Sequence, residues 1–246
     1  MFNYLIKIEY EGTNFVGWQS QKNGKTIQDN IEKALKKVLQ SDVRIVGAGR
    51  TDKGVHARVQ FANFKFKKKI ESKNKFLDSI NFFLRKKLIS IIDIKTKRKE
   101  FHARYSARER IYEYIIINRQ GSLSIDKNKA WHVKKKLNID LLKKGAKIFE
   151  GTHDFSTFRS SSCSAKSPIK KIKSITVKKN KDKIYVKFCS QSFLQHQVRS
   201  MVGCLEHLAK KKWSIKKFKE ALKSKKRSFC APPAPACGLY LLDIRY

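Results

Sequence analysis

A single acidic side chain, Asp52, lies in a basic, glycine-rich stretch that runs from residue 47 to residue 61. Glycines at 47, 49 and 54 permit positive φ angles and let the backbone come close to a ligand. The nearby cationic or titratable bases, which favour an ionised carboxylate, are Arg50, Lys53, His56 and Arg58. An ionised carboxylate can act as a nucleophile. Taken alone, however, the stretch is more typical of a tight turn with a surface ion pair.

Strands predicted on both sides of this loop place Asp52 at strand ends, where functional residues are often found. Residues 43–47 precede the loop and residues 59–66 follow it. Alternating apolar and polar residues predict another strand at 3–10, and residues 88–97 read as a fourth.

Two predicted helices complete this half of the chain. Thr26 and Asp29 fit a capping box at the start of helix 26–40, whose apolar stripe is Ile27, Ile31, Leu35 and Leu39. A second helix is expected at 73–86, with its inward residues being Phe76, Ile80, Phe83 and Leu84. The resulting β-α-β-β-α-β order indicates a ferredoxin-like unit with an antiparallel sheet and helices on one face.

The second half mixes strands and helices in the same way, without a detectable repeat. The predicted strands are 111–116, 171–178, 183–190 and 238–246, and the predicted helices are 138–149, 193–211 and 214–223. Residues 151–155 are expected to form a turn and residues 157–168 a loop. We therefore predict an α+β protein of two ferredoxin-like or RRM-like subdomains with mainly antiparallel sheets. Their ranges are 1–105, which carries the Asp52 loop, and 106–246.

The formal net charge of +37, from 57 Lys and Arg against 20 Asp and Glu, predicts a polyanionic partner such as nucleic acid or an anionic membrane surface. A lysine-rich composition also arises from an AT-rich genome, so the charge supports nucleic-acid binding without proving it. The N-terminus is too polar for a signal peptide and no apolar run is long enough to span a membrane, which predicts a cytoplasmic protein.

The cysteines predict neither a disulfide framework nor a metal site. Their number is odd and no C-x-x-C pair occurs among Cys163, Cys189, Cys204, Cys230 and Cys237. Reduced thiols are therefore expected, and the histidines show no ligand spacing.

The block Gly-Arg-Thr-Asp-x-Gly-Val-His at 49–56 resembles the signature of the tRNA pseudouridine synthase A family. Six more family-like blocks follow the family's order, at 9–19, 101–107, 110–114, 151–155, 193–203 and 235–239. Seven blocks in order cover nearly the whole chain. The resemblance implies two α/β subdomains with a basic active-site cleft between them. It also implies a homodimer, without cofactor or metal, that converts uridine to pseudouridine in the anticodon stem-loop of tRNA, at tRNA positions 38 to 40.

The same resemblance implies roles for individual residues. Asp52 falls on the catalytic aspartate, and Arg199 on the arginine that pairs with it. Tyr112 falls on the active-site tyrosine, Leu239 on an apolar residue of the uracil pocket, and Arg50 on an arginine that helps to flip the nucleotide. Further basic residues expected to contact RNA are Lys53, Arg58, Arg104 and Arg110. The sequence leaves open whether the aspartate attacks C1′ of the ribose or C6 of the ring.

Several alternatives remain at this stage. Tyr112 suits a strand core as well as stacking on a base. Lys53 and Ser20 depart from the family's usual residues, which affects the expected local RNA contacts. The rival functions are a pseudouridine synthase for another RNA and a non-catalytic RNA-binding protein, although the latter gives no reason for Asp52.

Overall fold

The structure, a computed structural model, describes residues 1–246, which form two compact units. The first unit contains residues 1–108 and 241–246, and the second contains residues 109–240. The chain thus passes between the units twice. The predicted boundary after residue 105 put everything beyond it into the second subdomain, whereas the structure groups residues 106–108 and 241–246 with the first.

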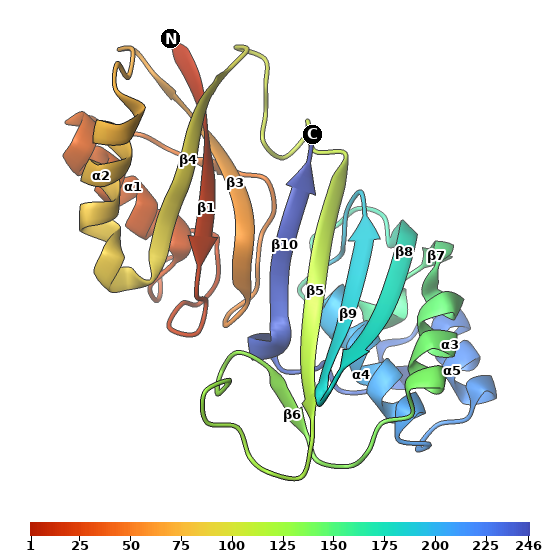
Figure 1. Cartoon of the computed structure of the whole chain (residues 1–246). Coiled ribbons are helices and arrows are strands. Elements are labelled where there is room, and N and C mark those ends of the chain that lie inside the picture. The colour runs from red at the N-terminus through yellow and green to blue at the C-terminus, as the bar shows by residue number, and fades with distance from the viewer. The chain divides into compact units, whose positions relative to one another are not determined.

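The first unit has a β-α-β-β-α-β order (Figure 1). Its elements are β1 (Phe2–Tyr10), α1 (Ile27–Leu39), β2 (Val46–Gly47), β3 (His56–Phe66), α2 (Lys73–Leu84), the 3-10 turn η1 (Arg85–Lys87) and β4 (Ile89–Lys97). Strand β1 is antiparallel to both β3 and β4, and β2 is antiparallel to β3. The order β4-β1-β3-β2 is that of a ferredoxin-like sheet.

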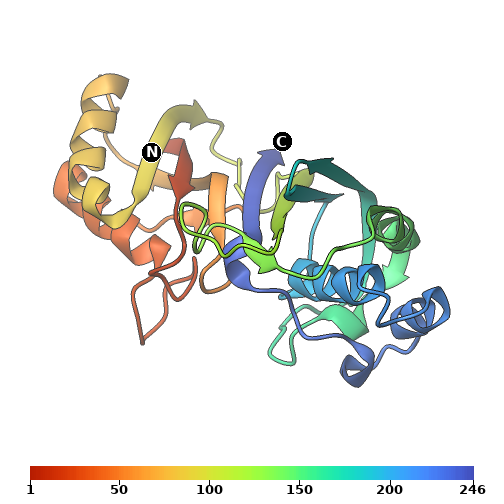
Figure 2. The same cartoon turned by 60° about the horizontal axis from the view of Figure 1, so that its bottom comes forward.

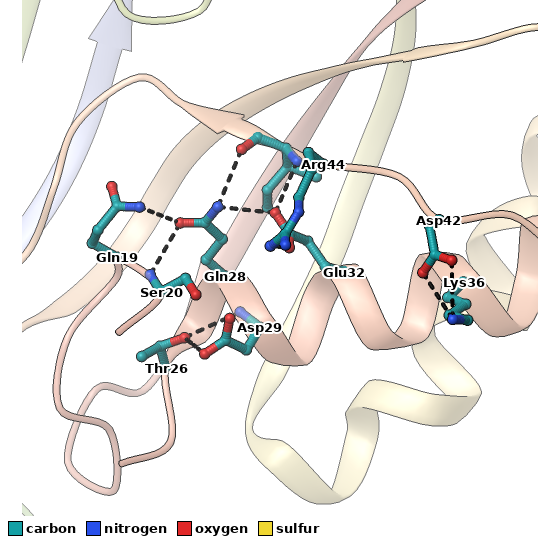
Figure 3. Close-up of polar contacts among 10 residues, drawn as sticks. Gln19, Ser20, Thr26, Gln28, Asp29, Glu32, Lys36, Asp42 and Arg44 are labelled. Carbon is teal, nitrogen blue, oxygen red and sulfur yellow. Dashed lines mark hydrogen bonds and ion pairs between the residues drawn. The ribbon is translucent and has the colours of Figure 1, made fainter. Parts of the chain in front are cut away.

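Helix α1 begins where the sequence predicted, because its N-terminus is capped locally. The Thr26 hydroxyl accepts a hydrogen bond from the Asp29 N–H at 3.1 Å and donates one to the Asp29 carboxylate at 2.5 Å (Figure 3). Ile27, Ile31 and Leu35 are fully buried along one face. This face and the cap together fix α1, which packs against α2.

Two predictions for the first unit were wrong in detail. Residues 43–45 do not form a strand, because the Ile45 N–H donates to the Glu32 carboxylate at 3.0 Å. Of the predicted strand 43–47, only the β2 residues Val46 and Gly47 pair with β3. Phe83 does not point inward: its side chain is 38% exposed, as the buried face of α2 follows the four-residue spacing of Phe76, Ile80 and Leu84.

The second unit is also built on a mainly antiparallel sheet. Its strands are β5 (Glu109–Asn118), β6 (Trp131–Val133), β7 (Gly151–Asp154), β8 (Ile169–Asn180), β9 (Lys183–Ser190) and the start of β10 (Leu239–Arg245). Strands β7, β8, β9 and β5 pair in that order, all antiparallel, and the short β6 runs parallel to β5. The predicted α+β class with mainly antiparallel sheets is confirmed.

Three helices pack together on this sheet (Figures 1 and 2). They are α3 (Ile139–Phe149), α4 (Gln197–Ala209) and α5 (Ile215–Lys223), accompanied by the 3-10 turns η2 (Ser156–Phe158), η3 (Arg227–Phe229) and η4 (Ala236–Gly238). Asn138 and Ser214 cap α3 and α5 through their side chains. No helix in either unit is long and apolar enough to cross a membrane.

The second unit corrects two further predictions. Residues 151–154 form β7, paired with β8, where a turn was predicted. Helix α4 starts four residues later than position 193, because His196 adopts a left-handed conformation with φ +63°. The Gln197 side chain then accepts the Leu194 N–H at 2.8 Å, which closes the turn before the helix.

All five cysteines are free thiols. The sulfur atoms of Cys204 and Cys230 lie 3.6 Å apart in the second unit. The two thiols share a hydrogen bond at this distance. That bond and burial raise the pKa of Cys204, whereas the same bond and the nearby Arg227 guanidinium lower the pKa of Cys230.

Helix α4 packs very closely against the segment 231–238, which leads into β10. A Cβ atom at Gly203 would lie only 2.1 Å from the Pro232 carbonyl oxygen. The Ala234 N–H donates to the Arg199 carbonyl in the same contact, at 3.0 Å. Glycine is therefore required at 203 by backbone proximity.

We expect Gly203→Ala to lower the free energy of unfolding by about 1–3 kcal/mol, because the added methyl group must push the 231–238 segment away. Urea unfolding measures this change. The matched control is Gly121→Ala, where the new methyl group meets no atom within 4 Å. Equal stability of the two variants would show that the close contact at Gly203 is not maintained in solution.

Candidate active site

The loop that carries Asp52 connects β2 to β3 and ends in a tight turn. The Val55 N–H donates to the Asp52 carbonyl at 3.2 Å, and Gly54 supplies the positive φ, +77°, that the turn needs at its third residue. Neither Gly47 nor Gly49 has a positive φ, in contrast to the sequence interpretation. Gly47 is instead required for packing, since a Cβ there would lie 2.5 Å from the Trp18 indole nitrogen.

Thr51, directly before the aspartate, is buried and held from two directions. Its hydroxyl shares a 2.7 Å hydrogen bond with the Tyr10 hydroxyl at the end of β1. Its carbonyl accepts the Trp18 N–H at 3.1 Å. The rings of Tyr10 and Trp18 also lie against each other, with centroids 6.0 Å apart. The backbone next to Asp52 is thereby fixed on a rigid support.

The segment between β1 and α1 lies directly against the Asp52 loop. A Cβ at Gly12 would be 1.9 Å from the Val55 carbonyl oxygen, and one at Gly17, whose φ is +123°, would be 2.8 Å from the Thr51 carbonyl oxygen. The Gly54 N–H donates to the Phe15 carbonyl at 3.3 Å. Two of the blocks that resemble the family, at 9–19 and 49–56, therefore form one tightly packed structure.

His56 has a structural role within this contact. The side chain is 2% exposed, and its Nδ1 accepts the Gly12 N–H at 3.1 Å. That nitrogen is thus unprotonated in the structure, and the imidazole connects the two blocks.

The first turn of α1 holds the other end of this segment (Figure 3). The N–H groups of Ile27 and Gln28 donate to the carbonyls of Gly17 and Trp18, at 3.1 and 3.0 Å. The Gln28 side-chain oxygen accepts the Ser20 N–H at 3.1 Å, and its amide group donates to Glu32. Because Ser20 contributes only its backbone here, its departure from the family residue leaves this contact unchanged.

The Gln28 oxygen also accepts a 2.9 Å hydrogen bond from Gln19, and its amide group donates to the Ile45 carbonyl at 3.4 Å, so four polar groups meet at one buried amide. Sequence reasoning missed Gln28, Tyr10 and Thr51 as residues that position the loop. A polar residue next to the apolar stripe of α1 was the one available signal for Gln28.

Among the first unit's candidate residues, the acidic side chain is less exposed to solvent than the basic ones. Asp52 is half-buried, whereas Arg50, Lys53, Arg58 and Arg104 are exposed. Arg50, Asp52 and Lys53 share the loop, Arg58 lies on β3, and Arg104 lies in the turn after β4. The Asp52 loop itself therefore carries its carboxylate between two exposed bases, Arg50 and Lys53.

In the second unit, β5 carries two of the candidate residues. Tyr112 is 8% exposed, and the edge of its ring packs on Phe193, with centroids 5.2 Å apart and planes at 88°. Arg110 is 9% exposed, and its guanidinium donates to the Gln191 carbonyl. Both contacts hold the segment before α4 against β5.

Arg199, in the first turn of α4, holds the 231–238 segment. Its Nε donates to the Ala234 carbonyl at 2.8 Å. Tyr114 on β5 holds the next peptide, since its hydroxyl donates to the Pro235 carbonyl at 2.7 Å. Burial raises the pKa of Tyr114 well above its ordinary value, so the phenol stays protonated and remains a donor.

Leu239 follows directly and is 5% exposed. Its position is fixed by Gly238, where a Cβ would lie 2.7 Å from the Tyr114 ring. The second unit thus brings Arg199 and Leu239 into one arrangement with β5, through the 231–238 segment. No three His, Cys, Asp or Glu side chains gather closely enough in the structure to hold a metal ion.

Comparison with known proteins identifies the family. The model of the tRNA pseudouridine synthase family matches residues 6–106 and 146–246. The tRNA pseudouridine synthase A of Pelagibacter ubique (strain HTCC1062) is 55% identical over 246 residues, with all of both chains covered. That of Maricaulis maris (strain MCS10) is 41% identical, over 100% of this chain and 98% of the relative. The chain belongs to the tRNA pseudouridine synthase family.

Proposed function

We propose that this chain is an isomerase that converts uridine to pseudouridine in tRNA, at positions 38 to 40 of the anticodon stem-loop, with Asp52 as the nucleophile. The relatives named tRNA pseudouridine synthase A support the reaction and the tRNA substrate. The observation that carries the assignment of Asp52 is its setting: a half-buried carboxylate on a loop whose backbone is immobilised by Tyr10, Trp18 and Gly12.

The reaction requires that the C1′–N1 bond breaks, that the uracil turns, and that C5 bonds to C1′. A carboxylate can carry this sequence as a nucleophile, by attacking either C1′ of the ribose or C6 of the ring. Both routes need an acid held in a fixed position relative to the nucleotide, because misplacement of a reacting group is costly. The packing around Thr51 meets that requirement.

The proposed substrate contacts come from both units. We assign Tyr112 to the uracil, where its ring can stack and its hydroxyl can take the C5 proton at the end. Leu239 supplies an apolar wall, and the Arg199 guanidinium supplies a positive charge to partner the carboxylate. Arg50, exposed on the Asp52 loop, is suited to fill the space that the flipped nucleotide leaves in the RNA stack.

The remaining RNA contacts are proposed from exposure. Lys53, Arg58 and Arg104 are exposed and are suited to bind phosphates. Arg110 is buried against Gln191 and fits a positioning role for β5 better than a phosphate contact. The resemblance to the family also leads us to propose a homodimer that acts in the cytoplasm without a cofactor.

We expect Asp52→Asn to lower pseudouridine formation about a thousandfold or more, the scale seen when a nucleophile is removed, while tRNA binding stays intact. Pseudouridine mapping in tRNA and a binding titration measure the two effects. Asp42→Asn is the matched control, because Asp42 is an exposed carboxylate of the same unit that pairs with Lys36. Substantial turnover by Asp52→Asn would remove Asp52 from the mechanism.

Arg199→Ala should lower kcat about a hundredfold, the scale of losing one electrostatic partner in an active site. The substitution also removes the hydrogen bond to Ala234, so its control is Tyr114→Phe, which removes the neighbouring bond to Pro235 and no charge. If Tyr114→Phe loses as much activity as Arg199→Ala, then Arg199 acts by holding the 231–238 segment and not by its charge.

Binding of tRNA should weaken steeply between low and moderate salt, because each phosphate neutralised contributes a slope of about 0.7 to 0.9 in log K against log salt. Lys53→Ala should reduce the magnitude of that slope by about the contribution of one phosphate contact. Lys36→Ala should leave it unchanged, since Lys36 pairs with Asp42 (Figure 3). Equal slopes for wild type and Lys53→Ala would show that Lys53 does not contact the RNA backbone.

A further inference from the structure

An aromatic pair of exposed Tyr105 and half-buried His102 lies on the first unit in the turn after β4. Tyr105 is 77% exposed, and its ring lies over that of His102, with centroids 4.3 Å apart and planes at 30°. The Arg104 guanidinium carbon is 5.7 Å from the centre of the Tyr105 ring. With most of the Tyr105 side chain in solvent, part of this aromatic surface is open to a ligand.

The turn holds His102 in a defined orientation beneath the tyrosine. Its Nδ1 accepts the backbone N–H groups of Arg104 and Tyr105, at 3.2 and 3.3 Å. Its carbonyl accepts the Ser106 N–H at 2.9 Å, and its own N–H donates to the Ser106 hydroxyl at 3.2 Å. The imidazole is therefore fixed by the same turn that presents Tyr105.

Two buried asparagines anchor this turn to the sheet. Asn63 on β3 accepts the Ala103 N–H at 2.8 Å and donates to the Asn3 side chain at 3.0 Å. Asn3 on β1 donates to the carbonyls of Arg98 and Phe101, both at 2.9 Å. A fully bonded buried network of this kind rigidifies what it holds. Such anchoring is more than an incidental surface tyrosine requires.

The charge around Tyr105 and His102 indicates the chemistry of a ligand that would bind there. Residues 97–108 contain one acid, Glu100, against five bases, which are Lys97, Arg98, Lys99, Arg104 and Arg108. An aromatic face among cations suits nucleic acid, in which bases stack on the ring and phosphates meet the charges. The cationic rim disfavours an apolar protein partner.

We propose that Tyr105 and His102 form a stacking platform for one nucleobase of the bound RNA, with Arg104 on an adjacent phosphate. The base stacked here is not the one that isomerises, because the platform is open to water and the chemistry needs an enclosed site. This inference rests on the proposed function in that it takes the RNA to be tRNA.

The test compares tRNA affinities of variants that still fold, as judged by circular dichroism. Tyr105→Ala should raise Kd roughly 5- to 100-fold, the range for loss of one base–aromatic stack, and Tyr105→Phe should bind within about twofold of wild type. The salt slope should stay unchanged in Tyr105→Ala and fall by about 0.7 to 0.9 in Arg104→Ala. Wild-type affinity in Tyr105→Ala would overturn the platform.

Phe82→Ala provides the matched control, because Phe82 is an aromatic residue of the same unit that is 59% exposed beside a cation, Arg85. It should bind tRNA like wild type. An equal loss of affinity in Phe82→Ala would also overturn the proposal, since the effect would then belong to any exposed ring.

The rate of a single turnover at saturating enzyme separates this inference from the proposed function. Tyr105→Ala should keep that rate within about twofold of wild type, because the platform contributes binding and touches no reacting atom. A rate loss at saturation, with Kd unchanged, would contradict a stacking role. If wild-type protein formed no pseudouridine in tRNA, the proposed function would fail, while the Kd comparison would still decide on the platform.

Discussion

The contact on which the first unit's site depends is the direct packing of one backbone segment against another. Residues 12–18 lie so close to residues 51–55 that Gly12 and Gly17 have no space for a Cβ atom. Three hydrogen bonds then join the two segments: Trp18 N–H donates to the Thr51 carbonyl, Gly54 N–H to the Phe15 carbonyl, and Gly12 N–H to the His56 imidazole. A loop fixed in this way loses little further entropy when a ligand binds, which suits the nucleophilic role that we propose for Asp52.

The second unit uses the same combination of devices. Gly203 and Gly238 permit close approach of the 231–238 segment, and a tyrosine hydroxyl, that of Tyr114, fixes a peptide by one short hydrogen bond. In the first unit the Tyr10 hydroxyl bonds the side-chain hydroxyl of Thr51. In both units the tyrosine lies on a central strand, so the sheet itself supports the segment that carries a candidate residue. Loops held by sheets are more precise than loops held by their own turns.

The sequence predicted those elements whose signals are local. The capping side chains of Thr26, Asn138 and Ser214 each accept a hydrogen bond from the backbone N–H three residues later, and the corresponding helices begin where predicted. Residues 43–45 and 151–154 were assigned wrongly because their partners, Glu32 and β8, are distant in the chain. Likewise, glycine spacing indicated flexible φ at 47, whereas the true constraint is the Trp18 ring.

The roles of the arginines show a similar limit. Arg110 reads in the sequence as one more base before a strand, yet it is buried and bonded to Gln191. No local pattern distinguishes it from Arg104, because exposure depends on how the segment before α4 folds onto β5. The resemblance to the family located Asp52 and its neighbours, but the residues that position them, Tyr10 and Gln28, became visible only through contacts across the fold.

The charge of the chain acquires a physical meaning once these contacts are known. With 57 bases and 20 acids, most cations have no acid to pair with, even if every acid forms a pair. The pairs that exist, such as Lys36 with Asp42 and Arg44 with Glu32, include exposed cations and contribute little to stability. The surplus therefore repels itself in the isolated protein. A bound polyanion relieves that repulsion and therefore stabilises the folded chain by mass action.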